Sequence, residues 1–420
     1  MRLLLGLEPK AASNVKTNRQ ISEKGYRKFA IAYLLFALLP VLSIGAFNVL
    51  VNPYGLFNVV NFKGINAAKP EKFNNDMLLK AVEVSRRQPK IIFLGTSRVQ
   101  WGLDANYSGL EESSYNLALQ GANMYELRRY FEHALVNQPE LEQVVIGLDE
   151  LMFSKFVEGR PDFDSDRLEK SHMGLQDGLN TIFSLDAFED SLQAVQANRD
   201  NPRSVLLSNF KVAPEVFVDG TLALDESKAA PGSVENFEAN LASRLRPNRA
   251  DGRYSQYELS NKSLKEFKKI VKISKRHNVD LKVFISPEHA TLFEAMNNVL
   301  YGPEIDLWKR ELVKIAPIWD FSGYNSITTE PLSGDMKYYL DSSHYSPETG
   351  NLILSRLLGH DLETVPAEFG ILLTPDNIES HLEKTRADRE KWVQKYPELA
   401  TWVQSVGQKL LKEQKADAQQ

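Results

Sequence analysis

The sequence contains no cysteine. Disulfides, thiolate metal sites, lipid attachment through cysteine and a cysteine nucleophile are therefore all excluded. The absence does not identify the compartment, because many proteins outside the cytoplasm also lack cysteine.

Several cofactor motifs are missing as well. The chain has neither a Gly-x-x-x-x-Gly-Lys phosphate loop nor a Gly-x-Gly-x-x-Gly dinucleotide turn, so we expect no bound nucleotide or other cofactor. Its histidines show no metal-ligand spacing such as His-Glu-x-x-His, so we expect no metal site. A formal net charge of -5, without a clustered Lys/Arg stripe, argues against a nucleic-acid partner.

Charged side chains are absent from residues 29–62. Within this stretch, residues 29–51 form a run of 23 mainly large apolar side chains. At about 1.5 Å per residue, a helix of this length crosses a hydrocarbon layer about 30 Å thick. A helix buried in a soluble core is the alternative, but core helices rarely avoid charge for so long. The run therefore predicts one transmembrane helix.

The flanking charge predicts the orientation of this helix. Residues 1–28 contain seven Lys or Arg against two Glu, and this positive excess predicts a cytoplasmic N-terminal segment. We therefore expect a single-pass protein of the cytoplasmic (inner) membrane with a periplasmic main domain. A cleaved signal peptide is the rival interpretation. Its apolar region usually has only about 7 to 15 residues, however, and no clear small-x-small cleavage site follows the longer run seen here.

After the anchor, apolar strand patterns alternate with amphipathic helical patterns. We predict strands at residues 90–94, 143–148 and 280–286, and helices at residues 123–137, 260–277 and 347–358. Strands separated by helices predict an α/β domain with a mostly parallel sheet that helices cover on both faces.

Two segments depart from this alternation. Residues 155–250 are polar and rich in turn-forming clusters, with one helix-like run near residues 185–198. We interpret them as an insertion at an edge of the sheet. Residues 361–420 are charged and helical in pattern, and we expect a peripheral extension there. The main domain is thus expected at residues 64–360.

Ser97 is the first candidate for chemistry. It directly follows the strand predicted at residues 90–94, and open α/β sheets place their ligands at the carboxyl ends of their strands. The alternative is that Ser97 is only the N-cap of the next helix.

Asp341 and His344 are the second candidate. They lie three residues apart in a polar loop, just before the helix predicted at residues 347–358. Histidine is the usual general base for a hydroxyl nucleophile, and a carboxylate on its other nitrogen orients it. The alternative is a plain surface loop, since this spacing is common. Because Ser97 and this pair lie near the two ends of one α/β domain, together they predict a serine-histidine-aspartate site.

Three sequence blocks resemble those of the SGNH (GDSL-like) hydrolase superfamily. The resemblance covers about residues 88–360 and depends on residues 95–98 (GTSR), residues 116–123 (NLALQGAN) and residues 341–344 (DSSH). It implies a three-layer α/β/α fold, preceded here by the one transmembrane helix. It also implies that Ser97 is the nucleophile.

The resemblance implies roles for the other site residues too. His344 becomes the base, Asp341 the acid that orients it, and the backbone N–H groups of Ser97 and Gly121 the oxyanion donors. Arg98 has two open roles, as a contact to an anionic substrate group or as the partner of a nearby acid.

Among family members, this sequence is most similar to extracytoplasmic proteins that acylate polymers. The GTSR block beside an N-terminal anchor resembles alginate O-acetylation proteins and the teichoic-acid D-alanylation protein. The resemblance implies an O-acyltransferase or esterase that acts on a cell-surface polysaccharide. It also implies a multi-span membrane O-acyltransferase as partner.

One position departs from the family pattern. Family enzymes commonly carry Gly-x-Asn-Asp in a further block, where the Asn completes the oxyanion hole, but this chain has Asp149 at the matching place. An ionised carboxylate donates no hydrogen bond. Either Asn123 supplies the donor or catalysis is weakened or lost. The alternative function is therefore an inactive module that binds glycan or scaffolds a membrane acyltransferase.

Other residues near the predicted site also have two interpretations. Trp101 and Tyr345 flank the nucleophile and the base, where they either stack on a sugar or pack in the core. His289 follows a strand at the same sheet edge and either lines the pocket or simply begins a helix.

Overall fold

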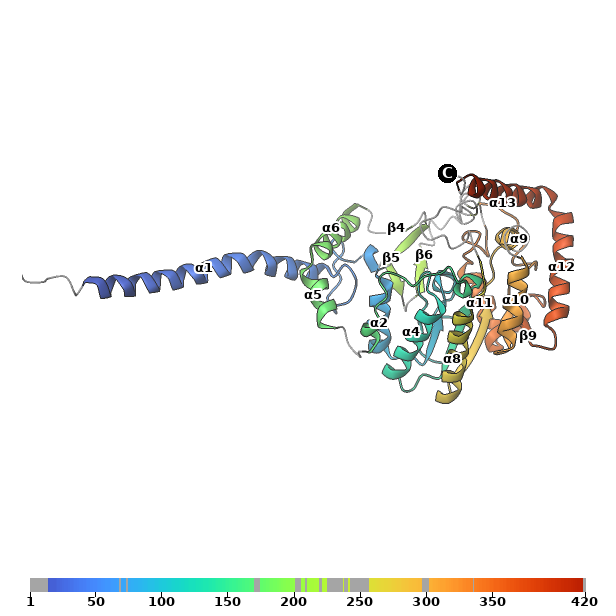
Figure 1. Ribbon diagram of the computed structural model, residues 1–420, viewed down its shortest axis with the longest axis horizontal. Coiled ribbons are helices and arrows are strands. Elements are labelled where there is room, and N and C mark those ends of the chain that lie inside the picture. Colours follow the sequence, from blue (N-terminus) through green and yellow to red (C-terminus); the bar gives the residue numbers. More distant parts are fainter. Residues whose placement is uncertain are drawn as a thin grey trace, which may run out of the picture.

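The computed structural model shows one long helix that projects from an α/β body (Figure 1). The residues it describes are 14–67, 69–72, 75–169, 174–200, 205–207, 210–218, 221–224, 237, 241, 257–296, 302–334 and 336–417.

The body is built on a six-stranded sheet in the order β2-β1-β3-β7-β8-β9. The strands are β1 (Ile91–Leu94), β2 (Ser114–Asn116), β3 (Gln143–Leu148), β7 (Asp280–Ile285), β8 (Ile318–Asp320) and β9 (Ile371–Leu373). All neighbours are parallel except β8 and β9. The prediction of a mixed α/β domain with a mostly parallel sheet is confirmed, as are its three predicted strands. The other three strands of this sheet were not predicted; each has only three residues, too few for a recognisable pattern.

Alternate side chains of each central strand enter two different cores. Ile92 and Leu94 pack with helices α2 (Asp76–Arg87), α4 (Met124–Asn137) and α8 (Asn261–His277) on one face. Ile91 and Phe93 belong to the other core, with helices α3 (Ser97–Gly102) and α11 (Pro347–Leu358). Because strand side chains alternate, an apolar run in a strand is buried on both sides. Helices therefore pack on both faces of the sheet.

Capping residues explain where the predicted helices begin and end. Ser260 caps the N-terminus of α8, and Asn278 ends that helix in the left-handed conformation. Ser346 caps α11, Pro347 fills its first turn, and Gly359 ends it with φ of 75°. These local signals placed both helices within one residue of their predicted bounds.

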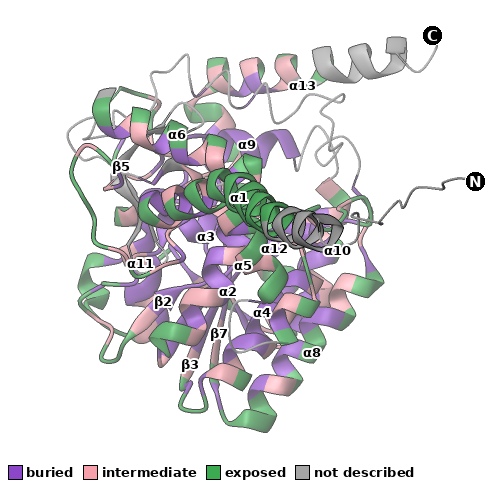
Figure 2. Ribbon diagram, turned by 90° about the vertical axis from the view of Figure 1, so that its left-hand side faces the viewer, coloured by how far each residue is buried: buried purple, intermediate pink, exposed green. Residues whose placement is uncertain are grey.

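Helix α1 (Asn14–Val51) contains the expected apolar run. Its segment Gly25–Val51 has a mean hydropathy of 2.4 and is long and apolar enough to cross a membrane. Side chains from residue 25 to residue 43 are all exposed. Figure 2, which looks along α1 toward the body, shows this exposed surface all around the helix.

The base of α1 is held by two helices of the insertion, α5 (Leu175–Phe183) and α6 (Leu185–Asp200). Asn48 is fully buried there; its Nδ2 donates to the Ile182 carbonyl at 3.0 Å, and its Oδ1 accepts from Ser191 Oγ at 2.9 Å. A Cβ at Gly45 would lie 2.6 Å from the Phe183 ring, so the helices touch closely. The end of α1 is thus part of the folded body.

The position of the insertion corrects the sequence-based expectation. The insertion connects β3 to β7. These two strands are neighbours in the centre of the sheet and do not lie at its edge. The described part of the insertion continues after α6 as a separate antiparallel sheet of β4 (Val205–Leu207), β5 (Phe210–Val218) and β6 (Thr221–Leu224). Strand β6 lies beside α3.

The C-terminal segment is helical as predicted, with α12 (Ile378–Lys395) and α13 (Pro397–Asp417). It is not wholly peripheral, because β9 extends the main sheet and the buried Trp392 packs with Ala290 and Ala400. An edge strand of three residues gives no clear signal in a sequence.

Candidate active site

Ser97 lies at the turn between β1 and α3 and is the first residue of α3. The N-cap of α3 is Thr96, whose hydroxyl accepts a hydrogen bond from Arg98 N at 3.3 Å. Ser97 is therefore not the capping residue, and its side chain is available for another partner.

That partner is His344. Its Nε2 lies 2.9 Å from Ser97 Oγ, and its Nδ1 lies 2.8 Å from Asp341 Oδ2. The other oxygen of Asp341 accepts from the backbone N–H groups of Ser343 and His344, at 2.7 Å each. This geometry favours the tautomer in which Nδ1 donates to the carboxylate and Nε2 accepts from the serine hydroxyl. The three predicted catalytic residues are thus brought together.

Close packing of α3 against α11 joins the two halves of the site. A Cβ at Gly350 would lie 1.7 Å from the Gly102 carbonyl oxygen, and a Cβ at Gly102 would lie 1.9 Å from the Tyr345 ring. Larger residues at either glycine would separate the helices. Because Ser97 begins α3 and His344 precedes α11, this contact brings together groups that are far apart in the sequence.

The aromatic residues beside the site are packing residues. The Trp101 ring lies 5.8 Å from the His344 ring, centroid to centroid, and Trp101 and Tyr345 are both buried. Their burial leaves neither face open for stacking on a sugar. Trp101 instead supports the imidazole from one side.

The segment around Gly121 lies beside the nucleophile turn. Leu119 N donates to the Gly95 carbonyl at 2.9 Å, which continues the pairing of β2 with β1. Gly121 itself has φ of 63°, in the region that favours glycine. Asp76 holds the segment by accepting from Gln120 N at 3.1 Å. This placement is consistent with Gly121 as an oxyanion donor.

Asn123 has a structural task in addition to any chemical one. Its Oδ1 accepts from the N–H groups of Tyr125 and Glu126, and Glu126 accepts in return from Asn123 N, so the residues form a capping box. With the oxygen engaged, the Nδ2 end is the one suited to donate to a substrate oxygen.

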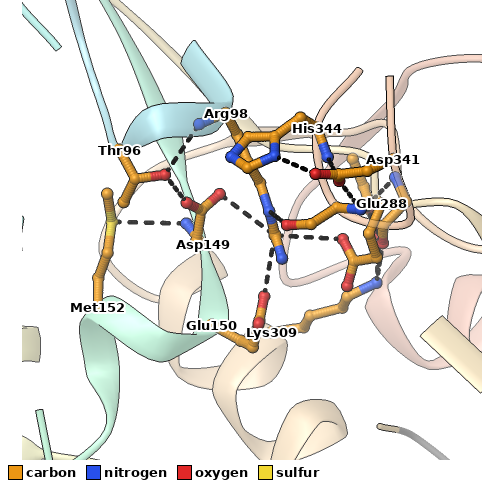
Figure 3. Close-up of polar contacts among 12 residues, drawn as sticks. Thr96, Arg98, Asp149, Glu150, Met152, Glu288, Lys309, Asp341 and His344 are labelled. Atoms are coloured by element: carbon orange, nitrogen blue, oxygen red, sulfur yellow. Dashed lines mark hydrogen bonds and ion pairs between the residues drawn. The ribbon is translucent and has the colours of Figure 1, made fainter. Parts of the chain in front are cut away.

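Arg98 occupies a buried ionic cluster under the site (Figure 3). Its Nη1 lies 3.4 Å from Asp149, 3.3 Å from Glu150 and 3.4 Å from Glu288. Its Nε donates to Ser343 Oγ at 3.1 Å, which ties the cluster to the loop that carries His344. Arg98 is only 3% exposed. Of the two roles left open for Arg98, the structure supports the pairing with nearby acids, because the guanidinium faces protein carboxyl groups.

Asp149 is a member of this cluster and also accepts from the hydroxyl of Thr96. It is buried at the carboxyl end of β3, beside the nucleophile turn. Because its oxygens accept from Thr96 and Arg98, Asp149 serves as an acceptor that positions the turn and supplies no oxyanion donor.

Comparison of the chain with protein-family models, curated proteins and solved structures found no match. Among the described residues, no group of three or more acidic or histidine side chains is placed to hold a metal ion.

His289 is a structural residue. It is buried at the N-cap of α9 (Ala290–Glu294), where its Nδ1 accepts from Thr291 N at 3.2 Å and its Nε2 lies 2.8 Å from the Glu330 carbonyl. Burial lowers the pKa of His289 to about 4, so the ring is neutral at neutral pH. Of its two interpretations, the structure supports the helix start.

Sequence reasoning missed Glu150, Glu288 and Ser343 as neighbours of Arg98. Glu288 had a usable signal, because it follows a predicted strand at the same sheet edge as Ser97. Which acids surround one arginine depends on the order of the strands, and that order is a tertiary property.

The cluster places three carboxylates around one guanidinium away from water. Burial, which disfavours charge, raises the pKa of Glu288 to about 8, and it also raises the pKa of Glu150. Arg98 opposes both shifts. Glu288 therefore keeps its proton at neutral pH and can donate a hydrogen bond within the cluster.

The free energy of unfolding of the Glu288→Gln variant is expected to increase relative to that of the wild type as pH rises. An unperturbed glutamate has a pKa of 4.5, whereas folded Glu288 titrates near 8. Between these values the folded wild type holds one more proton than the unfolded chain, so its free energy of unfolding falls as pH rises. Glutamine exchanges no proton. Urea unfolding of both chains at about pH 5, 7 and 9 measures this difference.

Glu379→Gln is the control for this experiment. Glu379 is exposed, and its hydrogen bond with Arg310 lowers its pKa, so any pH trend has the opposite sign. A stability difference for Glu288→Gln that stays constant across the range would show that folded Glu288 is ionised throughout.

Proposed function

We propose that this chain is a membrane-anchored, extracytoplasmic SGNH-type serine enzyme that moves an acyl group on or off a cell-surface polysaccharide. One observation carries the chemical part: the continuous hydrogen-bond chain from Ser97 through His344 to Asp341, with steps of 2.9 and 2.8 Å. This arrangement is the one required to activate a serine hydroxyl.

In the proposed reaction, Ser97 Oγ attacks the acyl carbonyl carbon of an ester while His344 Nε2 takes the hydroxyl proton. Backbone N–H groups of Ser97 and Gly121 stabilise the oxyanion, with Asn123 Nδ2 as a third donor. His344 then returns the proton to the departing alcohol, which leaves an acyl-serine. A sugar hydroxyl, or water, attacks the acyl carbon of this intermediate while His344 takes its proton. The bond between Ser97 Oγ and the acyl group then breaks, and His344 returns the proton to Ser97 Oγ.

The wider setting is supported by the fold and by the sequence resemblance. A mostly parallel sheet with helices packed on both faces agrees with a three-layer α/β/α SGNH domain. The apolar run of α1, which follows a segment rich in basic residues, supports a single-pass anchor in the cytoplasmic membrane with the body on the periplasmic side. In this setting a multi-span membrane O-acyltransferase is the proposed partner that delivers the acyl group.

Asp149 favours a second candidate function. Since Asp149 accepts hydrogen bonds from Thr96 and Arg98, it supplies no donor where family enzymes have asparagine. An SGNH-like module with an unreactive serine would bind glycan or scaffold the membrane acyltransferase.

Labelling with a fluorophosphonate probe distinguishes the two. We expect the full chain in detergent micelles to be labelled, and labelling to be lost in Ser97→Ala and in His344→Ala, because the probe requires an activated serine. Ser108→Ala, which removes an exposed serine, is the control and should be labelled like the wild type. A folded wild-type chain that resists the probe would favour the binding or scaffolding function.

A further inference from the structure

Large apolar side chains are exposed around the base of α1. Leu175, Leu179 and Phe183 recur every four residues and form one stripe along α5, with Leu175 81% exposed. Leu185 and Leu192, spaced by seven residues, form a similar stripe on α6. Stripes of this kind on neighbouring helices are unusual for a surface that faces only water.

The loop after α1 adds a third apolar element at the same level. Val60, Phe62 and Ile65 are exposed, with Val60 at 70%. Asn66 holds this loop against the end of α1, because its Nδ2 donates to the Leu50 carbonyl at 2.8 Å. The loop and the two helices therefore surround the same few turns of α1.

The length of the uncovered part of α1 indicates what these side chains contact. Residues 25–43 are exposed along their whole length, whereas α5 and α6 cover the helix from about residue 44. The charge-free part of this uncovered stretch, residues 29–43, is about 22 Å long at about 1.5 Å per residue, which is shorter than a hydrocarbon layer of roughly 30 Å. The hydrocarbon layer should therefore extend to the part of α1 that α5 and α6 cover.

We infer that α5, α6 and residues 57–66 form a collar that inserts its apolar side chains into the interfacial layer of the lipid bilayer around α1. The inference rests on the proposed membrane anchor. Figures 1 and 2 show α5 and α6 at the base of the projecting α1, on the face of the body that would meet the membrane.

The charge of the collar identifies the kind of lipid surface. The collar contains two basic residues, Lys63 and Arg199, and five acidic ones: Asp177, Asp186, Glu189, Asp190 and Asp200. Collars that bind anionic headgroups are basic, so this one depends on apolar insertion and suits a zwitterionic surface. Its membrane contact should be insensitive to salt.

The collar also makes the attachment rigid. Asn48 and Gly45 join α1 to α5 and α6. Helix α6 contacts residues 70–72, which in turn contact β5 of the small sheet, and strand β6 of that sheet lies beside α3. Ser97 begins α3, so the site is held at a defined position relative to the membrane surface instead of swinging on a tether.

Because the chain lacks cysteine, single-cysteine reporters test the collar directly. The full chain is reconstituted in phosphatidylcholine vesicles with an environment-sensitive fluorophore on Leu179→Cys or Val60→Cys in the collar. Leu34→Cys in the uncovered part of α1 and Leu372→Cys on β9 are the membrane and solvent references, and all four positions are exposed. Lipids carrying quenchers at headgroup or deep acyl positions report depth.

We expect headgroup-level quenchers to reduce the Leu179 and Val60 signals at least about twofold, as for interfacial helices about 5–10 Å deep. Deep quenchers should affect Leu34, and Leu372 should respond to neither. Collar reporters that behave like Leu372 while Leu34 is quenched deeply would overturn the collar and leave the anchor intact. An unquenched Leu34 would overturn the anchor and the collar together.

Collar reporters shielded from both lipid quenchers and aqueous iodide would also overturn the inference. That result would mean that a second copy of the chain covers the surface. Circular dichroism melts of each labelled variant confirm that the exposed cysteines leave the fold intact.

Discussion

Replacing Asp341 by asparagine is expected to slow acylation of Ser97 by about 10³–10⁴-fold without unfolding the chain. Asp341 Oδ1 accepts two backbone N–H groups, so the amide oxygen of asparagine should take that place. The amide nitrogen would then face His344 Nδ1 and force that nitrogen to accept. Nε2 would carry the proton and could no longer take one from Ser97.

The rate constant for fluorophosphonate labelling measures this effect. Asp361→Asn is the matched control, because Asp361 also contacts a histidine, His360, at 2.9 Å but on the exposed surface. Its labelling rate should equal that of the wild type. A similar rate in Asp341→Asn would mean that Asp341 does not set the tautomer of His344.

Replacing Arg98 by methionine is expected to destabilise the fold by about 3–5 kcal/mol, because the negative charge that remains on the buried acids around Arg98 loses its cation. The methionine side chain is close in size to the aliphatic part of arginine, so lost packing should contribute little to this destabilisation. The loop at Ser343 also loses its hydrogen bond to Arg98 Nε. We therefore expect slower labelling of Ser97 in the molecules that remain folded.

Urea unfolding in detergent micelles measures the stability change. Arg310→Met is the control, since the Arg310–Glu379 pair is largely exposed and such pairs contribute about 1 kcal/mol or less. At about pH 9, where wild-type Glu288 is ionised, adding Glu288→Gln to Arg98→Met should recover part of the loss, because one buried charge fewer is left without its cation. If Arg98→Met lowers the free energy of unfolding no more than the control does, the buried acids are already neutral.

The site has two parts. In the proposed reaction, Asp341 acts on the proton that Ser97 gives up, whereas Arg98 supports the loop and the turn that hold the reacting groups. Arg98, Asp149, Glu150 and Glu288 are thus positioning residues. They come from the carboxyl ends of β1, β3 and β7, the three neighbouring strands at the centre of the sheet.

The local features of this protein could be predicted from its sequence. The apolar run of α1, the strands β1, β3 and β7, and the caps of α8 and α11 each depend on residues that are close in the chain. Ser97, Asp341 and His344 were recognisable as candidates because each follows or precedes such an element. Their position next to a predicted strand or helix is visible in the sequence.

The tertiary structure decided the rest. Gly102 and Gly350 let α3 and α11 touch, and this contact brings Ser97 within 2.9 Å of His344 across 247 positions of sequence. The order of the strands decided that Arg98 meets three acids, and the packing of α5 and α6 decided which part of α1 stays exposed. A sequence pattern specifies which face of an element is apolar, whereas the partner of that face depends on how the whole chain packs.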